Sequence, residues 1–211
     1  MTSTDKKGDY NLKNIIVLGG SGYVGTHLAE LWLQQDSDIQ IFSISRHGRP
    51  NKCSPYLESN HRIQWLSVDI FNIDSYISKL PTQVDILVNL IGTADGKDLE
   101  TFMRINAEPV KVMIELMNRL SIAKGCFMSG LIGMPATNKL YLASKQKAEE
   151  MVRESKKNIS IIKPSLIYGD KPEVKALVPI IEVMSRLPGK SKYKPIRVDQ
   201  LAQEIIEVCS R

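Results

Sequence analysis

The sequence predicts an α/β protein in which three layers are built around a doubly wound parallel sheet. Two observations support this prediction. Short apolar runs rich in β-branched residues alternate with longer amphipathic stretches, and a glycine-rich segment joins the first run to the first amphipathic stretch. Because crossovers between parallel strands are right-handed, the helices cover both faces of the sheet, and we expect ligands at the carboxyl ends of the strands where the winding reverses.

Six apolar segments have the length and composition of buried strands. In order they are Asn14 to Leu18, Ile39 to Ser45, Arg62 to Val68, Val84 to Ile91, Gly125 to Ser129 and Ile159 to Lys163. Between them, Val24 to Gln35 has the pattern of an amphipathic helix. Met103 to Leu120 carries apolar residues three and four positions apart, which predicts one long helix packed on the sheet.

Length and composition indicate one globular domain. The chain has 211 residues, of which 43% are hydrophobic and 24% are charged, close to the averages for globular proteins. The net charge of +5 is too small to indicate a nucleic-acid partner. We expect residues 1–12 to form a flexible N-terminus and residues 13–211 to form the domain.

The cysteines and the N-terminus bear on the compartment. The three cysteines are far apart and form no CxxC pair, so we expect neither a disulfide framework nor a metal site. No run approaches about 18 apolar residues, so no transmembrane segment is predicted. Met1 to Lys13 carries Asp5 and Asp9, which suits neither a signal peptide nor a transit peptide. We therefore expect a soluble cytoplasmic protein.

The glycine-rich segment Gly19-Gly20-Ser21-Gly22-Tyr23-Val24-Gly25 follows the first strand and precedes the first helix, as a dinucleotide-binding Rossmann turn does. Gly19 permits a tight turn, Gly22 lets a pyrophosphate approach the backbone, and Gly25 lets the helix pack on the strand. Since the helix N-terminus offers N–H groups and partial positive charge, Ser21, Tyr23 and Val24 join this predicted site. The alternative is an ordinary turn that uses glycine for backbone freedom.

The second strand ends in Ser45-Arg46-His47-Gly48-Arg49, where NAD-selective Rossmann proteins place an acidic residue. Arg46 can pair with a 2'-phosphate and stack on adenine, and Arg49 is assigned to the same site. This favours NADP(H) over NAD(H), although a solvated arginine in a polar loop is the alternative. We interpret His47 as an exposed loop residue rather than a ligand.

Two further strand ends contribute to the predicted cofactor site. Asp69 and Ile70 follow the third strand, where a carboxylate can accept from the adenine amino group and an apolar side chain can cover the ring. Leu90, Ile91 and Gly92 close the fourth strand, and a glycine there lets the chain pass near the cofactor. Alternatively, Gly92 only ends a buried strand.

Tyr141 and Lys145 lie one helical turn apart, so their polar groups can meet one ligand. Ser129 ends the fifth strand at the sheet edge where the cofactor is expected. A nearby ammonium favours the phenolate of Tyr141, which predicts an acid/base, while Ser129 can donate a hydrogen bond to a substrate carbonyl oxygen. The alternative is a surface helix whose tyrosine and lysine have no such role.

Together these residues resemble the short-chain dehydrogenase/reductase superfamily, of the extended or atypical type that includes NAD-dependent epimerases and dehydratases. The resemblance covers Gly19, Gly22 and Gly25 as GxxGxxG, Asp69, the Asn106-Ala107 pair opening a long helix, Ser129, Tyr141, Lys145 and Lys163-Pro164-Ser165-Leu166-Ile167-Tyr168-Gly169. The last run is similar to an RPxxxYG segment with Lys163 in place of Arg, and Ile196 to Ala202 is similar to a V-D-x-x-A segment that starts the closing helix.

The resemblance implies a Rossmann fold that binds NAD(P). It also implies that Pro164 and Ile167 meet the nicotinamide carboxamide and that Asn106 supports the catalytic site. Within the superfamily, the chain is similar to atypical members related to the accessory subunit of complex I and to fungal members of coenzyme Q assembly. Several such members hold the cofactor without catalysis, and homodimers formed through helices at the edge of the fold are common.

The C-terminal region predicted to bind substrate is minimal, because only 42 residues follow Gly169. We therefore do not expect the chain to act as a nucleotide-sugar epimerase or dehydratase, because such enzymes of the family build their substrate site from a larger C-terminal region. Within residues 170–197, Val174 to Tyr193 contains a strongly apolar helix followed by basic residues. We interpret it as a lid over an apolar substrate, a peripheral membrane contact or a partner surface. The alternative, a helix packed on the sheet, is the simpler one.

The function predicted from these residues is that of an NADP(H)-dependent oxidoreductase acting on a small carbonyl, enone or quinone substrate. Tyr141 is the predicted acid/base, Lys145 tunes it, Ser129 orients the substrate and Asn106 supports the site. A non-catalytic NADP(H)-binding module used in assembly or redox sensing is the second interpretation. A nucleotide-sugar epimerase or dehydratase is the third.

Overall fold

The computed structural model describes residues 12–130, 138–169, 178–185 and 193–211. Its main sheet has six parallel strands in the order β3-β2-β1-β4-β5-β6. These strands are β1 Lys13–Leu18, β2 Ile39–Ser45, β3 Ile63–Ser67, β4 Ile86–Asn89, β5 Lys124–Met128 and β6 Ile159–Ile162. The predicted doubly wound parallel sheet is confirmed, and each strand lies within two residues of its predicted position.

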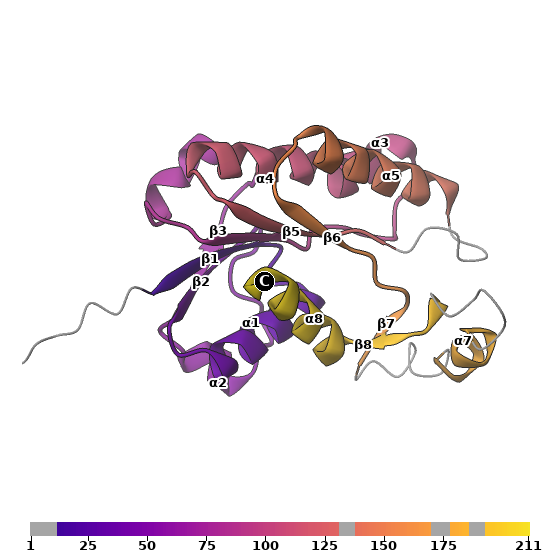
Figure 1. Ribbon diagram of the computed structural model, residues 1–211, viewed down its shortest axis with the longest axis horizontal. Coiled ribbons are helices and arrows are strands. Elements are labelled where there is room, and N and C mark those ends of the chain that lie inside the picture. The colour runs from indigo at the N-terminus through magenta and orange to yellow at the C-terminus, as the bar shows by residue number, and fades with distance from the viewer. Residues whose placement is uncertain (1–11, 131–137, 170–177, 186–192) are drawn as a thin grey trace, which may run out of the picture.

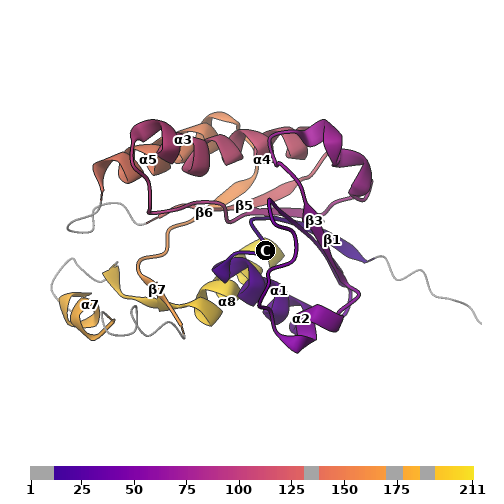
Figure 2. The same ribbon diagram turned by 180° about the vertical axis from the view of Figure 1, so that it is seen from behind.

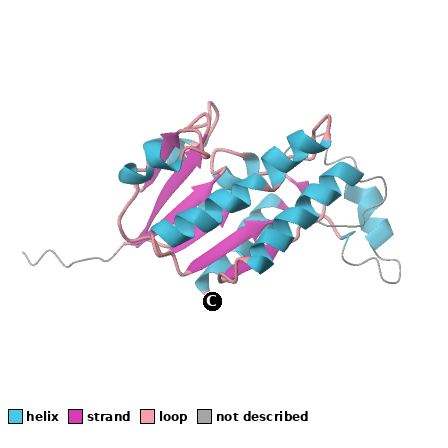
Figure 3. Cartoon of the chain, turned by 90° about the horizontal axis from the view of Figure 1, so that it is seen from above, coloured by secondary structure: helices cyan, strands magenta, loops and turns pink. Residues whose placement is uncertain are grey.

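Helices form a layer on each face of the sheet (Figure 1). One layer contains α3 Leu99–Asn106, α4 Glu108–Arg119 and α5 Lys139–Glu154, which lie along the strands when seen from above (Figure 3). The other contains α1 Tyr23–Gln35, α2 Pro55–Ser59 and α8 Val198–Ser210. Two short turns of 3-10 helix, Ile73–Ser75 and Ile77–Lys79, follow β3. This is the predicted three-layer arrangement.

The alternation of side chains along a strand builds a core on each face. In β1, Ile15 and Val17 belong to the cluster that α1 and α8 cover, whereas Ile16 and Leu18 belong to the cluster that α4 covers. All four side chains are at most 1% exposed. A strand buried on both faces has no polar alternation, which is why these strands appear in the sequence as continuous apolar runs.

The prediction of one continuous helix over Met103 to Leu120 is wrong. The chain forms α3 up to Asn106 and then α4 from Glu108, with Ala107 between them and Pro109 in the first turn of α4. Proline has no N–H group to donate to the carbonyl four residues earlier, and it is favoured in the first turn of a helix, so one helix ends and another begins here. Asn106 therefore ends a short helix instead of opening a long one.

The winding of the sheet reverses between β1 and β4, so the loops that follow these strands meet at one edge. A second sheet of β7 Ile167–Tyr168 and β8 Ile196–Arg197 lies beside the main body, near α7 Val178–Ser185 (Figure 2). Most of the predicted lid over residues 170–197 lies outside the described residues. In the described part of the chain, no helix has the length and apolar character needed to cross a membrane.

Candidate functional site

The glycine-rich turn connects β1 to α1 in a conformation that two of its glycines impose. Gly19 has a φ of +80°, in the left-handed region that favours glycine. A Cβ atom at Gly25 would lie 2.5 Å from the carbonyl oxygen of Gly20, so no side chain fits between α1 and the turn. Gly22 occupies the N-cap of α1 and has no side chain, so it does not cap the free N–H groups of the first helical turn.

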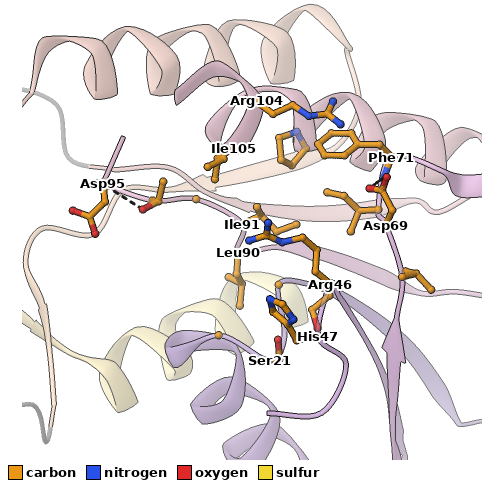
Figure 4. Close-up of a pocket in the computed structure, with 18 residues that line it drawn as sticks. Ser21, Arg46, His47, Asp69, Phe71, Leu90, Ile91, Asp95, Arg104 and Ile105 are labelled. Carbon is orange, nitrogen blue, oxygen red and sulfur yellow. Dashed lines mark hydrogen bonds between the residues drawn. The ribbon is translucent and has the colours of Figure 1, made fainter. Parts of the chain in front are cut away.

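A cavity of about 820 Å³ extends from this turn across the carboxyl ends of β2, β3 and β4 (Figure 4). Nine predicted cofactor residues line it: Gly19, Ser21, Gly22, Arg46, Asp69, Ile70, Leu90, Ile91 and Gly92. Its lining also includes residues that the sequence did not indicate: Ser45, His47, Val68, Phe71, Thr93, Asp95, Arg104, Ile105 and Pro109. The volume is in the range of small-molecule and cofactor sites.

The other predicted site residues lie elsewhere. In the described part of the chain, the lining does not include Tyr23, Val24, Gly25, Arg49, Asn106, Ser129, Tyr141, Lys145, Pro164 or Ile167. Val24 and Gly25 are buried in α1, and Ile167 belongs to β7. A Cβ atom at Gly169 would collide with the Tyr23 hydroxyl, so the start of α1 lies close to the end of the RPxxxYG-like segment.

Arg46 enters the cavity from the end of β2. Its backbone carbonyl accepts a hydrogen bond of 2.9 Å from the Ser67 hydroxyl at the end of β3, which fixes the backbone of the turn. Its side chain extends toward Ile91 (Figure 4) and forms no ion pair with a described residue. His47 is exposed, as predicted, and also lines the cavity. Arg46 therefore offers an uncompensated positive charge to whatever binds here.

The β3 side of the cavity is apolar with a charged rim. The hydroxyl of the buried Tyr76 donates to the backbone carbonyl of Ile70 at 2.9 Å, which holds Ile70 under the cavity. Burial raises the pKa of Tyr76, so this phenol remains a donor. Asp69 is exposed and accepts from the backbone N–H of Phe71 at 3.1 Å. The Arg104 guanidinium carbon lies 3.4 Å from the Phe71 ring centroid, which closes this wall by a cation–π contact.

Gly92 joins the cavity to the side chains of α3 and α5. A Cβ atom at Gly92 would lie 2.6 Å from the Lys145 Nζ atom and 2.9 Å from the Asn106 Oδ1 atom. The Asn106 side chain accepts from the backbone N–H of Thr93 at 2.8 Å and donates to the Thr93 carbonyl and the Ser144 hydroxyl, each at 3.1 Å. Asn106 thus holds the loop after β4 against α5.

Tyr141 and Lys145 lie beside this loop. The Lys145 Nζ atom is 6.0 Å from the Tyr141 ring centroid and 3.4 Å from the Met128 carbonyl oxygen, to which it donates. Burial lowers the pKa of Lys145 to about 8, against the opposing effect of the Glu149 charge. Burial also raises the pKa of Tyr141. A Cβ atom at Gly130 would collide with the Tyr141 hydroxyl, so this phenol rests on the chain just after β5.

Ser129 is buried at the end of β5, and its hydroxyl donates to the Glu149 Oε1 atom at 2.8 Å. A hydroxyl has one proton, so Ser129 would donate to a substrate only if it gave up this hydrogen bond. The sequence did not indicate Glu149, because an acidic residue in an amphipathic helix is ordinarily expected to face the solvent. Its position two helical turns after Tyr141 is the one signal available in the sequence.

Comparisons with known proteins identify the family and the fold. Residues 15–190 match the model of the NAD dependent epimerase/dehydratase family. The chain is 25% identical to the decarboxylating sterol-4-alpha-carboxylate 3-dehydrogenase of Candida albicans over 87% of this chain and 58% of that protein. It is 22% identical to an uncharacterised chloroplastic protein of Arabidopsis thaliana over 94% of this chain and 72% of that one. The chain thus spans little more than half the length of the sterol dehydrogenase.

Solved structures share the fold. UDP-glucuronic acid 4-epimerase from Bacillus cereus, in complex with NAD, superposes with a TM-score of 0.69 at 20% identity, over 93% of this chain and 74% of that one. The dTDP-glucose 4,6-dehydratase from Bacillus anthracis, also in complex with NAD, gives a TM-score of 0.68 at 18% identity, over 94% and 72% of the two chains.

Proposed function

Because the chain belongs to the NAD dependent epimerase/dehydratase family, we propose that it is an NADP(H)-dependent oxidoreductase acting on a small carbonyl, enone or quinone substrate. One observation carries the proposal. The Lys145 ammonium packs against Gly92, which lines the cavity that begins at the glycine-rich turn. The Tyr141–Lys145 pair therefore lies at the edge of the site where we place the cofactor.

The residues around the cavity fit a dinucleotide. Gly22 at the N-cap has no side chain to cover the N-terminus of α1, where backbone N–H groups attract a pyrophosphate. Ile70 and Phe71 offer an apolar wall for an adenine ring. A bound nicotinamide cofactor would give a hydride to the substrate carbon or take one from it.

The chain's own residues then handle the proton. Tyr141 donates its phenolic proton to the substrate oxygen during reduction and accepts it back during oxidation. A phenol is a weak acid near neutral pH, and burial raises the pKa of Tyr141 further. Loss of the phenolic proton therefore requires a nearby positive charge that stabilises the phenolate. The Lys145 ammonium supplies that charge by favouring the phenolate. Asn106 keeps the loop at Gly92 in place beside Lys145.

The preference for NADP(H) rests on Arg46. Its side chain lies in the cavity without an ionic partner among the described residues, and the sequence places no carboxylate at this strand end to repel a 2'-phosphate. Arg49 is exposed three residues further on and adds positive charge near the same turn. We expect both arginines to strengthen the binding of the phosphorylated cofactor.

Two other functions make different predictions. In the relatives named as nucleotide-sugar epimerases and dehydratases the fold is the same, and such reactions return the hydride, so they consume no cofactor overall. A module used only for assembly or redox sensing would bind NADP(H) without turnover. Net consumption of NADPH therefore separates the proposed oxidoreductase from both.

The test begins with thermal unfolding in the presence of NADPH, NADH or neither, since a ligand that binds the native state stabilises it by RT ln(1 + [L]/Kd). We expect a larger rise in the melting temperature with NADPH. Aldehydes, enones and quinones are then supplied with NADPH, and its absorbance is followed. Tyr141→Phe should abolish turnover and keep the melting-temperature rise. If neither cofactor stabilises the protein, or Tyr141→Phe turns over at the wild-type rate, the proposal is wrong.

A further inference from the structure

The core of the described chain contains two charged side chains, Lys145 and Glu149, both on α5. Glu149 is only 1% exposed. Its Oε1 atom accepts the hydrogen bond from Ser129, and its Oε2 atom lies 2.7 Å from an Arg153 nitrogen and 2.6 Å from the Lys163 Nζ atom. A carboxylate buried in this way is stable only when it is paired and hydrogen-bonded, and here both oxygens have partners.

The partners of Glu149 come from its own helix and from the ends of two neighbouring strands. Ser129 follows β5, Lys163 follows β6 and Arg153 lies one turn further along α5. The two cations reach Glu149 from the surface, since their side chains are 63% and 41% exposed for Arg153 and Lys163. Glu149 therefore joins the helix that carries Tyr141 and Lys145 to the ends of the two strands below it.

The groups around Lys145 show why the negative charge of Glu149 affects the protonation of Lys145. From β5, Lys145 meets the Met128 carbonyl oxygen, and its Nζ atom lies 5.4 Å from the Phe127 ring centroid. From the loop after β4 and from α3 it meets Gly92 and the neutral amide of Asn106. On its own helix the titratable groups near it are Tyr141 and Glu149. Glu149 is thus the negative charge that offsets the burial of Lys145 among these groups.

We propose that Glu149 is a positioning residue of this site: its carboxylate fixes the hydroxyl of Ser129 and holds the buried Lys145 in its ammonium form beside Tyr141. The proposal rests on the proposed function for its role in catalysis, but the state of Lys145 can be measured without any reaction. Because the Ser129 hydroxyl donates its one hydrogen bond to Glu149, Ser129 can only accept hydrogen bonds from its other neighbours.

The test is a pH titration of Lys145 in the free, full-length protein by NMR, with lysine labelled at the ε carbon and Lys145→Arg used to assign its signal. We expect Lys145 to titrate near pH 8 in the wild type. In Glu149→Gln the midpoint should move to lower pH by about one unit, because an opposite charge nearby is lost. The matched control is Glu150→Gln, which removes an exposed acid paired with Lys147 and should leave the midpoint unchanged.

A second variant should shift the Lys145 midpoint in the opposite direction, and it tests the proposal even if Glu149→Gln does not fold. Lys163→Gln removes a half-exposed cation next to Glu149, so the Lys145 midpoint should move to higher pH. An unchanged midpoint in folded Glu149→Gln, or no upward movement in Lys163→Gln, would overturn the proposal. If the proposed function were wrong but this proposal correct, NADPH would not be consumed, and the Lys145 midpoint would still shift in both variants.

Discussion

In the proposed oxidoreductase, Arg46 is the residue that distinguishes NADPH from NADH. Arg46→Ala removes a guanidinium that lies in the cavity without an ionic partner among the described residues. A charge-assisted hydrogen bond contributes about 1.5–3 kcal/mol, so the affinity for NADPH should fall by about 10-fold or more. The affinity for NADH should change little, because NADH has no 2'-phosphate. Titration of the cofactor fluorescence on binding measures both affinities.

Arg49→Ala is the matched comparison, because Arg49 is exposed but does not line the cavity. Its charge acts from a greater distance through solvent, and we expect a smaller loss of NADPH affinity that salt reduces further. An equal loss of NADPH and NADH affinity in Arg46→Ala would refute the assignment of Arg46 to the 2'-phosphate.

Residues close to a strand end were predictable, whereas residues brought in from a neighbouring element were not. Asp69 and Gly92 come two and three residues after β3 and β4, and parallel strands place their carboxyl ends at one edge. Arg104 reaches the cavity from α3, and its guanidinium lies over the ring of Phe71, which follows β3. Glu149 meets Ser129 and Lys163 through the packing of α5 on two strands, a long-range contact that no local pattern encodes.

At the scale of elements, the packing of α1 on the glycine-rich turn depends on Gly25. In Gly25→Ala the new Cβ atom would lie 2.5 Å from the Gly20 carbonyl oxygen, so α1 must move away from the turn. Overpacking of this kind costs about 1–3 kcal/mol, and we expect the free energy of unfolding to fall by that amount. Urea unfolding followed by circular dichroism measures it, and cofactor binding should be lost with it.

Gly22→Ala provides the comparison within the same turn. Among the described residues, a Cβ atom at Gly22 would meet only the Gly19 carbonyl oxygen, at 3.2 Å, so the turn needs to adjust by a few tenths of an ångström. We expect Gly22→Ala to unfold near the wild-type urea concentration while it binds NADPH more weakly, since the methyl group faces the pyrophosphate position. If Gly25→Ala were as stable as Gly22→Ala, the close packing of α1 would not be the constraint.

The elements were predictable where burial alone determines the pattern. The strands are covered on both faces, so their continuous apolar runs indicate them to within two residues. The break at Ala107 was not predicted from the apolar stripe, because that stripe belongs to α4, whereas the buried Phe102 of α3 packs against Tyr141 of α5. Pro109 was the available signal, since a proline in the first turn of a helix is typical of a helix start.

At the scale of the whole molecule, the buried Lys145 couples stability to pH. Its pKa falls from 10.5 to about 8 on folding because of burial. Below about pH 8 the side chain is charged in both states, and the folded state carries the cost of burying the ammonium. Between about pH 8 and 10.5 the unfolded state binds more protons, so the free energy of unfolding contributed by this residue rises with pH. Lys145 therefore destabilises the fold at neutral pH.

Lys145→Met should remove this cost and leave Glu149 paired with Lys163 and Arg153. At neutral pH the variant should be more stable than the wild type by up to about 3 kcal/mol, and the difference should shrink as the pH approaches about 10. Urea unfolding of both proteins at the two pH values measures it, since other titrating groups cancel in the difference. Lys147→Met, at an exposed position of the same helix, should show no such pH dependence. A stability difference that stays constant with pH would contradict this prediction. It would mean that Lys145 has the same pKa in the folded and unfolded chains, so that burial of its ammonium group beside Tyr141 does not destabilise the folded protein.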